Sequence, residues 1–133
     1  MKNLLNSLFL MLSFCLITHT AIAAQAFDVT GTWSGTVTLD NGNELPFVAI
    51  LEQRGTSVTG VLAGIGGAPD VTISNGRIED DTLRFDGVRQ IQGEAVAFEY
   101  IGSFVGESIN FTIIRVGATG PNSVLNTITT RQP

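Results

Sequence analysis

Apolar and polar residues alternate with a period of two along most of residues 31–131, and few stretches carry apolar residues at helical spacing. Successive side chains of a β-strand point to opposite faces, so this alternation predicts half-buried strands. Val, Ile, Thr and Phe are frequent in the alternating stretches, and Gly, Asn and Asp separate them. We therefore expect an all-β domain.

The turn residues predict how these strands are connected. About eight strands are expected, at residues 31–39, 45–53, 57–63, 70–74, 77–79 with 82–86, 94–101, 103–105 with 108–116, and 123–131. Asn-Gly in DNGN (40–43) and SNGR (74–77) is the strongest short signal for a hairpin turn. Hairpins in chain order predict a single antiparallel meander. Closing the meander removes its two unpaired edges, so we expect a barrel, with a β-sandwich as the alternative.

Trp33, the only tryptophan, falls near the start of the first expected strand. It shares one strand face with Gly35, Val37 and Leu39, whereas the other face carries threonine and serine. The apolar face should point into the barrel. We therefore expect Trp33 to seal one barrel end with its large ring.

Residues 1–26 have the features of a secretory signal peptide. Lys2 precedes a mostly apolar stretch, and small residues offer cleavage sites after Ala23 or Ala26. The apolar stretch is short for a transmembrane helix, which needs about 20 residues, although an uncleaved anchor is the alternative. We expect cleavage to leave residues 27–133 as one β-barrel domain of a secreted or periplasmic protein.

Cleavage would remove Cys15, His19 and Lys2, each the only residue of its type. Since Lys2 is one of seven basic residues, six arginines then stand against twelve acidic residues, a formal net charge of −6. This balance argues against nucleic acid and anionic membranes as partners. The short strands and few aromatic residues argue against insertion of the mature chain into a membrane.

The same composition limits the chemistry of residues 27–133. Without histidine, cysteine and lysine, the usual nucleophiles, general bases and zinc ligands are missing. The acidic run at 79–81 is interpreted as a hairpin turn rather than as a calcium site, because it lacks the spacing of a calcium loop. We expect no enzyme, no catalytic residue, no metal and no cofactor.

The string GTW (31–33), at the start of the first strand, resembles the G-x-W signature of calycin barrels of the lipocalin and avidin types. VTGTW followed by VTGVL (58–62) is most similar to the avidin type. Leu62 stands where an avidin-type tyrosine would be expected, and there is no second tryptophan, so biotin binding is not implied. The overall pattern is also similar to small secreted bacterial β-proteins of unknown function.

In lipocalins, an arginine on the last strand packs across this tryptophan, and two arginines of this chain are candidates for that role. If Val124 and Ile128 point inward, Arg131 points outward by the period of two. Arg115 shares a strand face with apolar residues. Arg115 is therefore the arginine that we expect over the ring.

Two function classes remain open. The first is a non-enzymatic binding protein that holds a small apolar or anionic ligand in the barrel mouth. Such a site should be lined by Trp33, Phe98, Tyr100 and Phe104, with Arg115 available for an anionic head group. The second is a structural or interaction protein with a fully packed barrel, whose loops or strand edges meet a protein partner.

Overall fold

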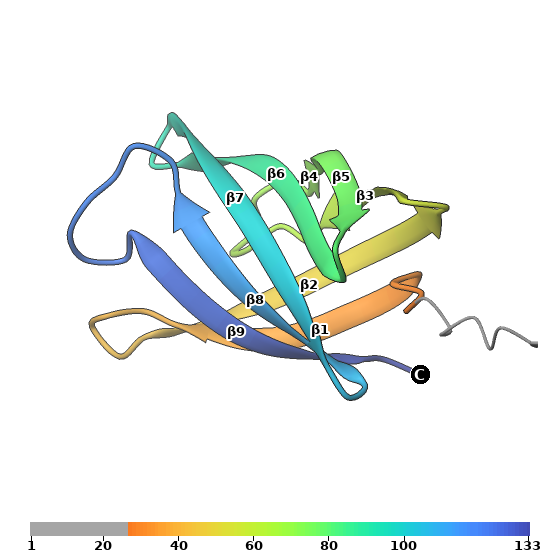
Figure 1. The fold of residues 1–133 in the computed structure, drawn as a ribbon. Helices are drawn as coiled ribbons and strands as arrows, with labels where there is room; N and C mark the ends of the chain where they lie inside the picture. The colour runs from red at the N-terminus through yellow and green to blue at the C-terminus, as the bar shows by residue number, and fades with distance from the viewer. Residues whose placement is uncertain (1–26) are drawn as a thin grey trace, which may run out of the picture.

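The computed structural model describes residues 27–133, so the expected signal peptide and its cleavage sites lie outside the described residues. Nine strands follow one another along this part of the chain (Figure 1). They are β1 (Gly31–Thr38), β2 (Glu44–Arg54), β3 (Ser57–Leu62), β4 (Val71–Thr72), β5 (Ser74–Glu79), β6 (Thr82–Ile91), β7 (Glu94–Val105), β8 (Ser108–Arg115) and β9 (Val124–Arg131). Residues 27–133 contain no helix of the length and hydrophobicity that crossing a bilayer requires.

The strands form one antiparallel sheet that closes on itself. Each long strand pairs with the long strands before and after it in the chain, so that β5 lies beside β3 in the sheet. The first and last strands, β1 and β9, also pair and complete the ring. The two-residue strand β4 pairs with β3 beside β5. The expected antiparallel meander of about eight strands closed into a barrel is confirmed, in preference to a β-sandwich.

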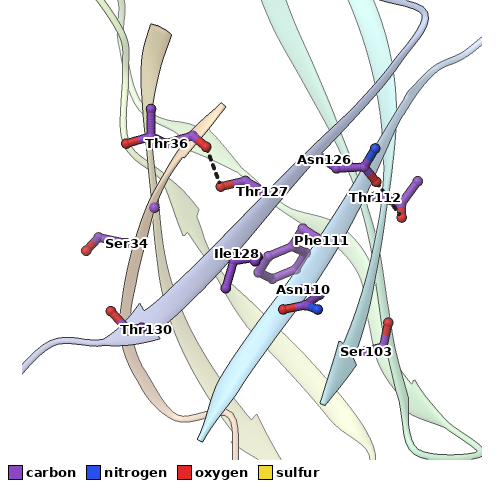
Figure 2. Close-up of a pocket in the computed structure, with 11 residues that line it drawn as sticks. Ser34, Thr36, Ser103, Asn110, Phe111, Thr112, Asn126, Thr127, Ile128 and Thr130 are labelled. Carbon is purple, nitrogen blue, oxygen red and sulfur yellow. Dashed lines mark hydrogen bonds between the residues drawn. The ribbon is translucent and has the colours of Figure 1, made fainter. Parts of the chain in front are cut away.

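The ring closes with few backbone bonds between β1 and β9. The two strands pair only at Trp33–Arg131 and Ser34–Thr130. Beyond this point Thr127 Oγ1 donates a hydrogen bond of 2.9 Å to the carbonyl oxygen of Thr36 (Figure 2). A side-chain hydrogen bond therefore joins the two strands where they have no register pair.

Inward-pointing side chains form one continuous core, as the alternation predicted. Trp33 is fully buried, and Val37 on the same face is 6 % exposed. The other large buried side chains come from β2, β3 and β6–β8, and include Phe47, Leu62, Leu83, Phe85, Tyr100, Ile109 and Phe111. On β9 the buried residues are Thr127 and Thr129, each hydrogen-bonded to a backbone carbonyl.

Three local predictions are wrong, and each concerns a glycine. SNGR is not a hairpin turn but an irregularity within β5, where Asn75 has φ 53° and the pairing with β6 shifts register. Gly87 and Gly102 do not end strands either, because β6 and β7 continue through them. At Gly102 a Cβ would lie 2.8 Å from Ile109 Cγ2, so neighbouring side chains occupy the space that the glycine leaves.

Candidate ligand-binding site

The two ends of the barrel differ in packing. At the end away from Trp33, a cavity of about 750 Å³ opens between the strands and loop 63–70. This volume is in the range of small-molecule sites. Its apolar walls come from seven strands and from loop residues, and include Val37, Leu39, Leu45, Phe47, Ile65, Pro69, Val71, Val88, Ile91, Phe98, Ile113 and Leu125.

Two aromatic side chains of β7, Phe98 and Tyr100, form one wall of the cavity. Both point inward and are buried, and their rings lie 6.3 Å apart. Tyr100 is stacked on Phe85 at 4.9 Å and contacts Phe47 at 6.1 Å. The phenol thus forms an aromatic floor for the cavity and presents its hydroxyl toward the open end.

Arg89 on β6 reaches this hydroxyl. Its Nε donates to Tyr100 Oη at 3.3 Å, and its Nη1 donates to the carbonyl oxygen of Ala63 at 3.4 Å. Burial raises the pKa of Tyr100 above its ordinary value of 10.0, and the charge of Arg89 partly opposes this. Tyr100 is therefore neutral at physiological pH. Because its oxygen accepts from Arg89, its own proton remains available to a ligand.

Arg115 lies at the rim of the same cavity, on β8. It is paired in register with Phe98 and is largely exposed to solvent. Arg89 is paired with Val96 on the other edge of β7. The two arginines therefore approach the cavity from the two strands that flank β7.

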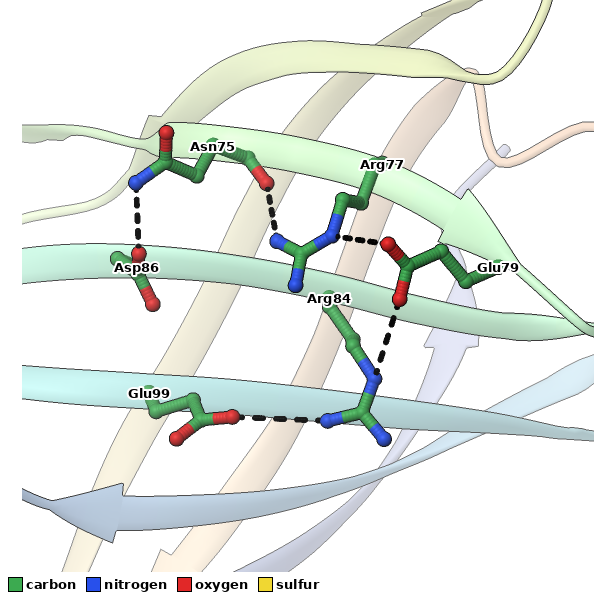
Figure 3. A network of polar contacts seen from close by, with 6 residues as sticks. All are labelled: Asn75, Arg77, Glu79, Arg84, Asp86 and Glu99. Atoms are coloured by element: carbon green, nitrogen blue, oxygen red, sulfur yellow. Dashed lines mark hydrogen bonds and ion pairs between the residues drawn. The ribbon is translucent and has the colours of Figure 1, made fainter.

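Neither cavity arginine has a carboxylate within 4.0 Å among the described residues. The arginines on the outer surface behave differently: Arg77 pairs with Glu79 at 2.7 Å, and Arg84 contacts both Glu79 and Glu99 (Figure 3). One carboxylate lines the cavity, that of Asp70, and it accepts a 2.8 Å bond from the backbone N–H of Gly64. The charged side chains that line the cavity are thus two arginines and one aspartate, whose carboxylate already accepts a hydrogen bond.

Trp33 lies at the opposite, closed end. Its Nε1 donates a 2.9 Å hydrogen bond to the carbonyl oxygen of Val29, and Phe27 packs 5.9 Å from its ring. Phe104 lies at this end too, stacked on Phe27 at 4.2 Å. Of the five residues predicted to line a site, Phe98, Tyr100 and Arg115 meet at the cavity, whereas Trp33 and Phe104 lie outside its walls.

The prediction that Arg115 packs over Trp33 is wrong. The guanidinium carbon of Arg131 lies 4.6 Å from the centre of the Trp33 ring. The premise failed because Val124 and Ile128 point outward, at 53 % and 66 % exposed. Arg131 therefore points toward the ring, and it donates hydrogen bonds to the backbone carbonyls of residues 28 and 30.

Arg89 was not among the residues predicted to line the site. The expected strand ended at Asp86, so Arg89 was not placed on a strand face. The signal was present, since Leu83, Phe85 and Gly87 precede Arg89 at a period of two and all three are buried. A strand allowed to continue through Gly87 would have put this arginine inside the barrel.

Comparisons with known proteins support the fold alone. No family model matches the chain, and no curated protein matches it. A solved structure described as a redesigned β-barrel is similar with a TM-score of 0.56 and 16 % identity, over 78 % of this chain and 91 % of that one. Among residues 27–133, no group of three histidine, cysteine, aspartate or glutamate residues is arranged to hold a metal ion.

Proposed function

We propose that this protein binds a small amphipathic anion in the open half of its barrel, without chemical turnover. The observation that carries the proposal is the pairing of an apolar cavity of about 750 Å³ with two arginines that have no carboxylate partner among residues 27–133. The apolar part of the ligand packs against the aromatic and aliphatic walls. Its anionic group lies between Arg89 and Arg115.

The polar groups of the cavity favour an acceptor as the head group. Both guanidinium groups donate only, and the Tyr100 hydroxyl retains a proton to donate. A carboxylate, sulfonate or sulfate would accept from these donors, whereas a protonated amine offers no acceptor and would be repelled by both guanidinium groups. The site should therefore distinguish ligands by head-group charge more sharply than by the shape of the apolar part.

Binding rather than catalysis is supported by the same lining. Carboxylate catalysis of hydrolysis uses two acids that converge on the substrate. Asp70 is the one carboxylate that lines this cavity, and the backbone N–H of Gly64 already donates to it. Binding by Arg89, Arg115 and the Tyr100 hydroxyl requires no proton transfer.

Secretion and a calycin relationship are part of the proposal. The case for secretion rests on residues 1–26 and is tested by sequencing the N-terminus of the exported protein. The calycin relationship is supported by Arg131, which lies on the last strand and packs over Trp33 as the lipocalin resemblance implies. No nucleic acid and no membrane insertion of the mature chain are proposed.

A matched pair of fluorescent probes tests the function. 1-Anilinonaphthalene-8-sulfonate and N-phenyl-1-naphthylamine share one ring system, but only the first carries a sulfonate. We expect the protein to bind the sulfonate probe at least about tenfold more tightly than the neutral probe. A tenfold difference is about 1.4 kcal/mol, close to the lower limit for a hydrogen bond to a charged group. Arg89→Met and Arg115→Met should remove that preference, with little effect on the neutral probe.

The control is Arg54→Met, since Arg54 lies on the surface and pairs with Glu52 at 2.8 Å. It should leave both affinities unchanged. Equal affinity for the two probes in wild type would overturn the anion assignment. If neither probe bound, the cavity would hold no ligand of this class, and the interaction-protein alternative would be favoured.

A further inference from the structure

The seam between β1 and β9 is, with that between β3 and β5, one of two sparsely paired joints of the barrel wall. β1 pairs with β2 at eight positions, and β9 pairs with β8 at seven, but β1 and β9 pair with each other at two. No register pair joins residues 35–38 to residues 124–128. Over the open half of the barrel, these two strands lie together without a ladder.

Side chains hold this part of the seam closed. Thr127 Oγ1 bonds to the Thr36 carbonyl oxygen at 2.9 Å. Further toward the open end, Asp40 and Asn122 bond reciprocally: the Asp40 N–H donates to Asn122 Oδ1 at 2.8 Å, and the Asn122 N–H donates to Asp40 Oδ2 at 2.6 Å. This Asp40–Asn122 clasp joins the β1–β2 turn to the β8–β9 loop.

Gly35 marks where the closed part of the seam ends. A Cβ there would collide with the carbonyl oxygen of Ile128 and lie 2.7 Å from Thr127 Oγ1. The two backbones are therefore in direct contact at Gly35, and the paired residues Ser34 and Thr130 come immediately before it. The strands can separate above this contact while the pairs below it stay in place.

A hollow lies on each side of the same seam. Val37, Leu39 and Leu125 form part of the inner cavity wall. On the outside, Thr36 and Ile128 belong to a shallow depression whose other lining residues are Ser, Thr, Asn, Gly and Phe, with no charged side chain (Figure 2). Thr36 and Val37 are consecutive residues of β1, so the depression and the cavity adjoin opposite faces of this strand.

Two other routes lead to the cavity, the axial mouth and the β3–β5 seam. Loop 63–70 lines the axial mouth with Ile65 and Pro69, and it carries the carboxylate of Asp70. The β3–β5 seam has one register pair, but two backbone hydrogen bonds and the short strand β4 also hold it. The Ile73 N–H donates to the Gly60 carbonyl oxygen of β3 at 3.0 Å, and the Ile78 N–H donates to the Thr56 carbonyl oxygen of the preceding turn at 2.8 Å. An anion approaching a chain of net negative charge meets no carboxylate in the outer depression.

We propose that the ligand enters and leaves the cavity sideways, between β1 and β9 above Gly35, and that the Asp40–Asn122 clasp controls this opening. The inference rests on the proposed function for its ligand, but the opening of the seam can be measured without one. Closing the clasp slows exchange of the ligand, and losing it speeds both entry and release.

Stopped-flow fluorescence with 1-anilinonaphthalene-8-sulfonate tests the route. Asp40→Ala removes one half of the clasp, and Asn122→Gly removes the other while tolerating the φ of 58° at that position. Each variant should raise the association and dissociation rate constants together, by about tenfold for the loss of one to two hydrogen bonds. The dissociation constant should change by less than about threefold, because an equal rise in both rates cancels in their ratio.

The matched control is Asp28→Ala, which removes an exposed carboxylate that accepts a 2.9 Å hydrogen bond from the Thr30 N–H at the closed end of the barrel. Under lateral entry it leaves both rates unchanged. If Asp40→Ala also leaves both rates unchanged, the ligand uses the axial mouth and the proposal is overturned. A Cys15→Ser protein with Asp40→Cys and Asn122→Cys joined by a short bis-maleimide should exchange the probe more slowly than the same protein before cross-linking.

Hydrogen exchange without probe separates this proposal from the proposed function. Asp40→Ala should speed exchange of the amides of residues 36–38 and 124–128 that face the seam, and leave the β7–β8 ladder unchanged. Unchanged exchange at the seam would overturn the gate, whatever the probes do. If exchange increases but no anionic probe binds, the seam opens and the proposed ligand is wrong, so lateral entry of that ligand fails with it.

Discussion

Replacing Trp33 by alanine should remove most of the stability of this protein. The side chain is fully buried, its Nε1 bonds to the Val29 carbonyl oxygen, and Arg131 covers one ring face. Deleting a buried tryptophan costs about 3–5 kcal/mol, and leaving the Val29 carbonyl without its donor adds about 1 kcal/mol. A total of about 4–6 kcal/mol approaches the whole stability of a small domain, about 5–15 kcal/mol.

Urea denaturation followed by far-ultraviolet circular dichroism measures this loss. Because Trp33→Ala could fail to fold, Trp33→Phe provides a milder step that keeps an aromatic ring and loses the N–H bond and part of the cation–π contact. It should cost about 1–2 kcal/mol, and combining it with Arg131→Met should show coupling between the two sites. A free energy of unfolding for Trp33→Ala within about 1 kcal/mol of the wild-type value would refute the idea that this ring seals the barrel.

Two further predictions concern Gly35 and Tyr100. Gly35→Ala should destabilise the fold by about 1–3 kcal/mol, because its Cβ meets the Ile128 backbone. Gly87→Ala should cost less, because its Cβ meets only side-chain atoms, at 3.3 Å or more. Equal urea midpoints for the two variants would contradict this. Tyr100 is the only tyrosine, so tyrosinate absorbance reports its pKa directly. Burial raises that pKa, so its contribution to stability is complete below pH 10.0 and is lost as pH rises from 10.0 through the folded value. Arg89→Met should raise the pKa further, and a fall would contradict the contact.

The fold was predictable because its determinants are local. The DNGN turn joins β1 to β2, with Gly42 at φ 86°, where only a residue tolerant of positive φ fits easily. The period of two placed Trp33 and Val37 inside the barrel. The prediction of a hairpin turn at SNGR was wrong because Asn-Gly is also compatible with a β-bulge. Asn75 adopts the positive φ within β5, and the strand continues.

The site was only partly predictable because it depends on relations between distant strands. Phe98 and Tyr100 could be assigned to an inward face from their own strand. Which arginine lies near which aromatic ring depends on the register of β8 and β9 and on the inward direction of Thr127 and Thr129, whose hydroxyls bond to backbone carbonyls. Polar residues inside a strand hide the alternation on which such predictions depend.

Packing differs along the barrel axis, and this difference separates stability from the candidate function. The closed end combines buried aromatic rings with Arg131 and the paired part of the β1–β9 seam. The open end has the cavity, the two arginines without carboxylates and the unpaired part of the same seam. Changes at the closed end should therefore act on unfolding, and changes at the open end on binding.

A nuclear magnetic resonance titration of the isotopically labelled protein with 1-anilinonaphthalene-8-sulfonate tests the central claim most directly. We predict saturable, one-to-one shifts at the amides of Val37, Arg89, Phe98 and Arg115, and none beyond scatter at Val105 near the closed end. Arg89→Met combined with Arg115→Met should abolish saturation at the same probe concentrations. Shifts confined to the outer surface, or saturation that persists in the double variant, would contradict an anion-binding cavity.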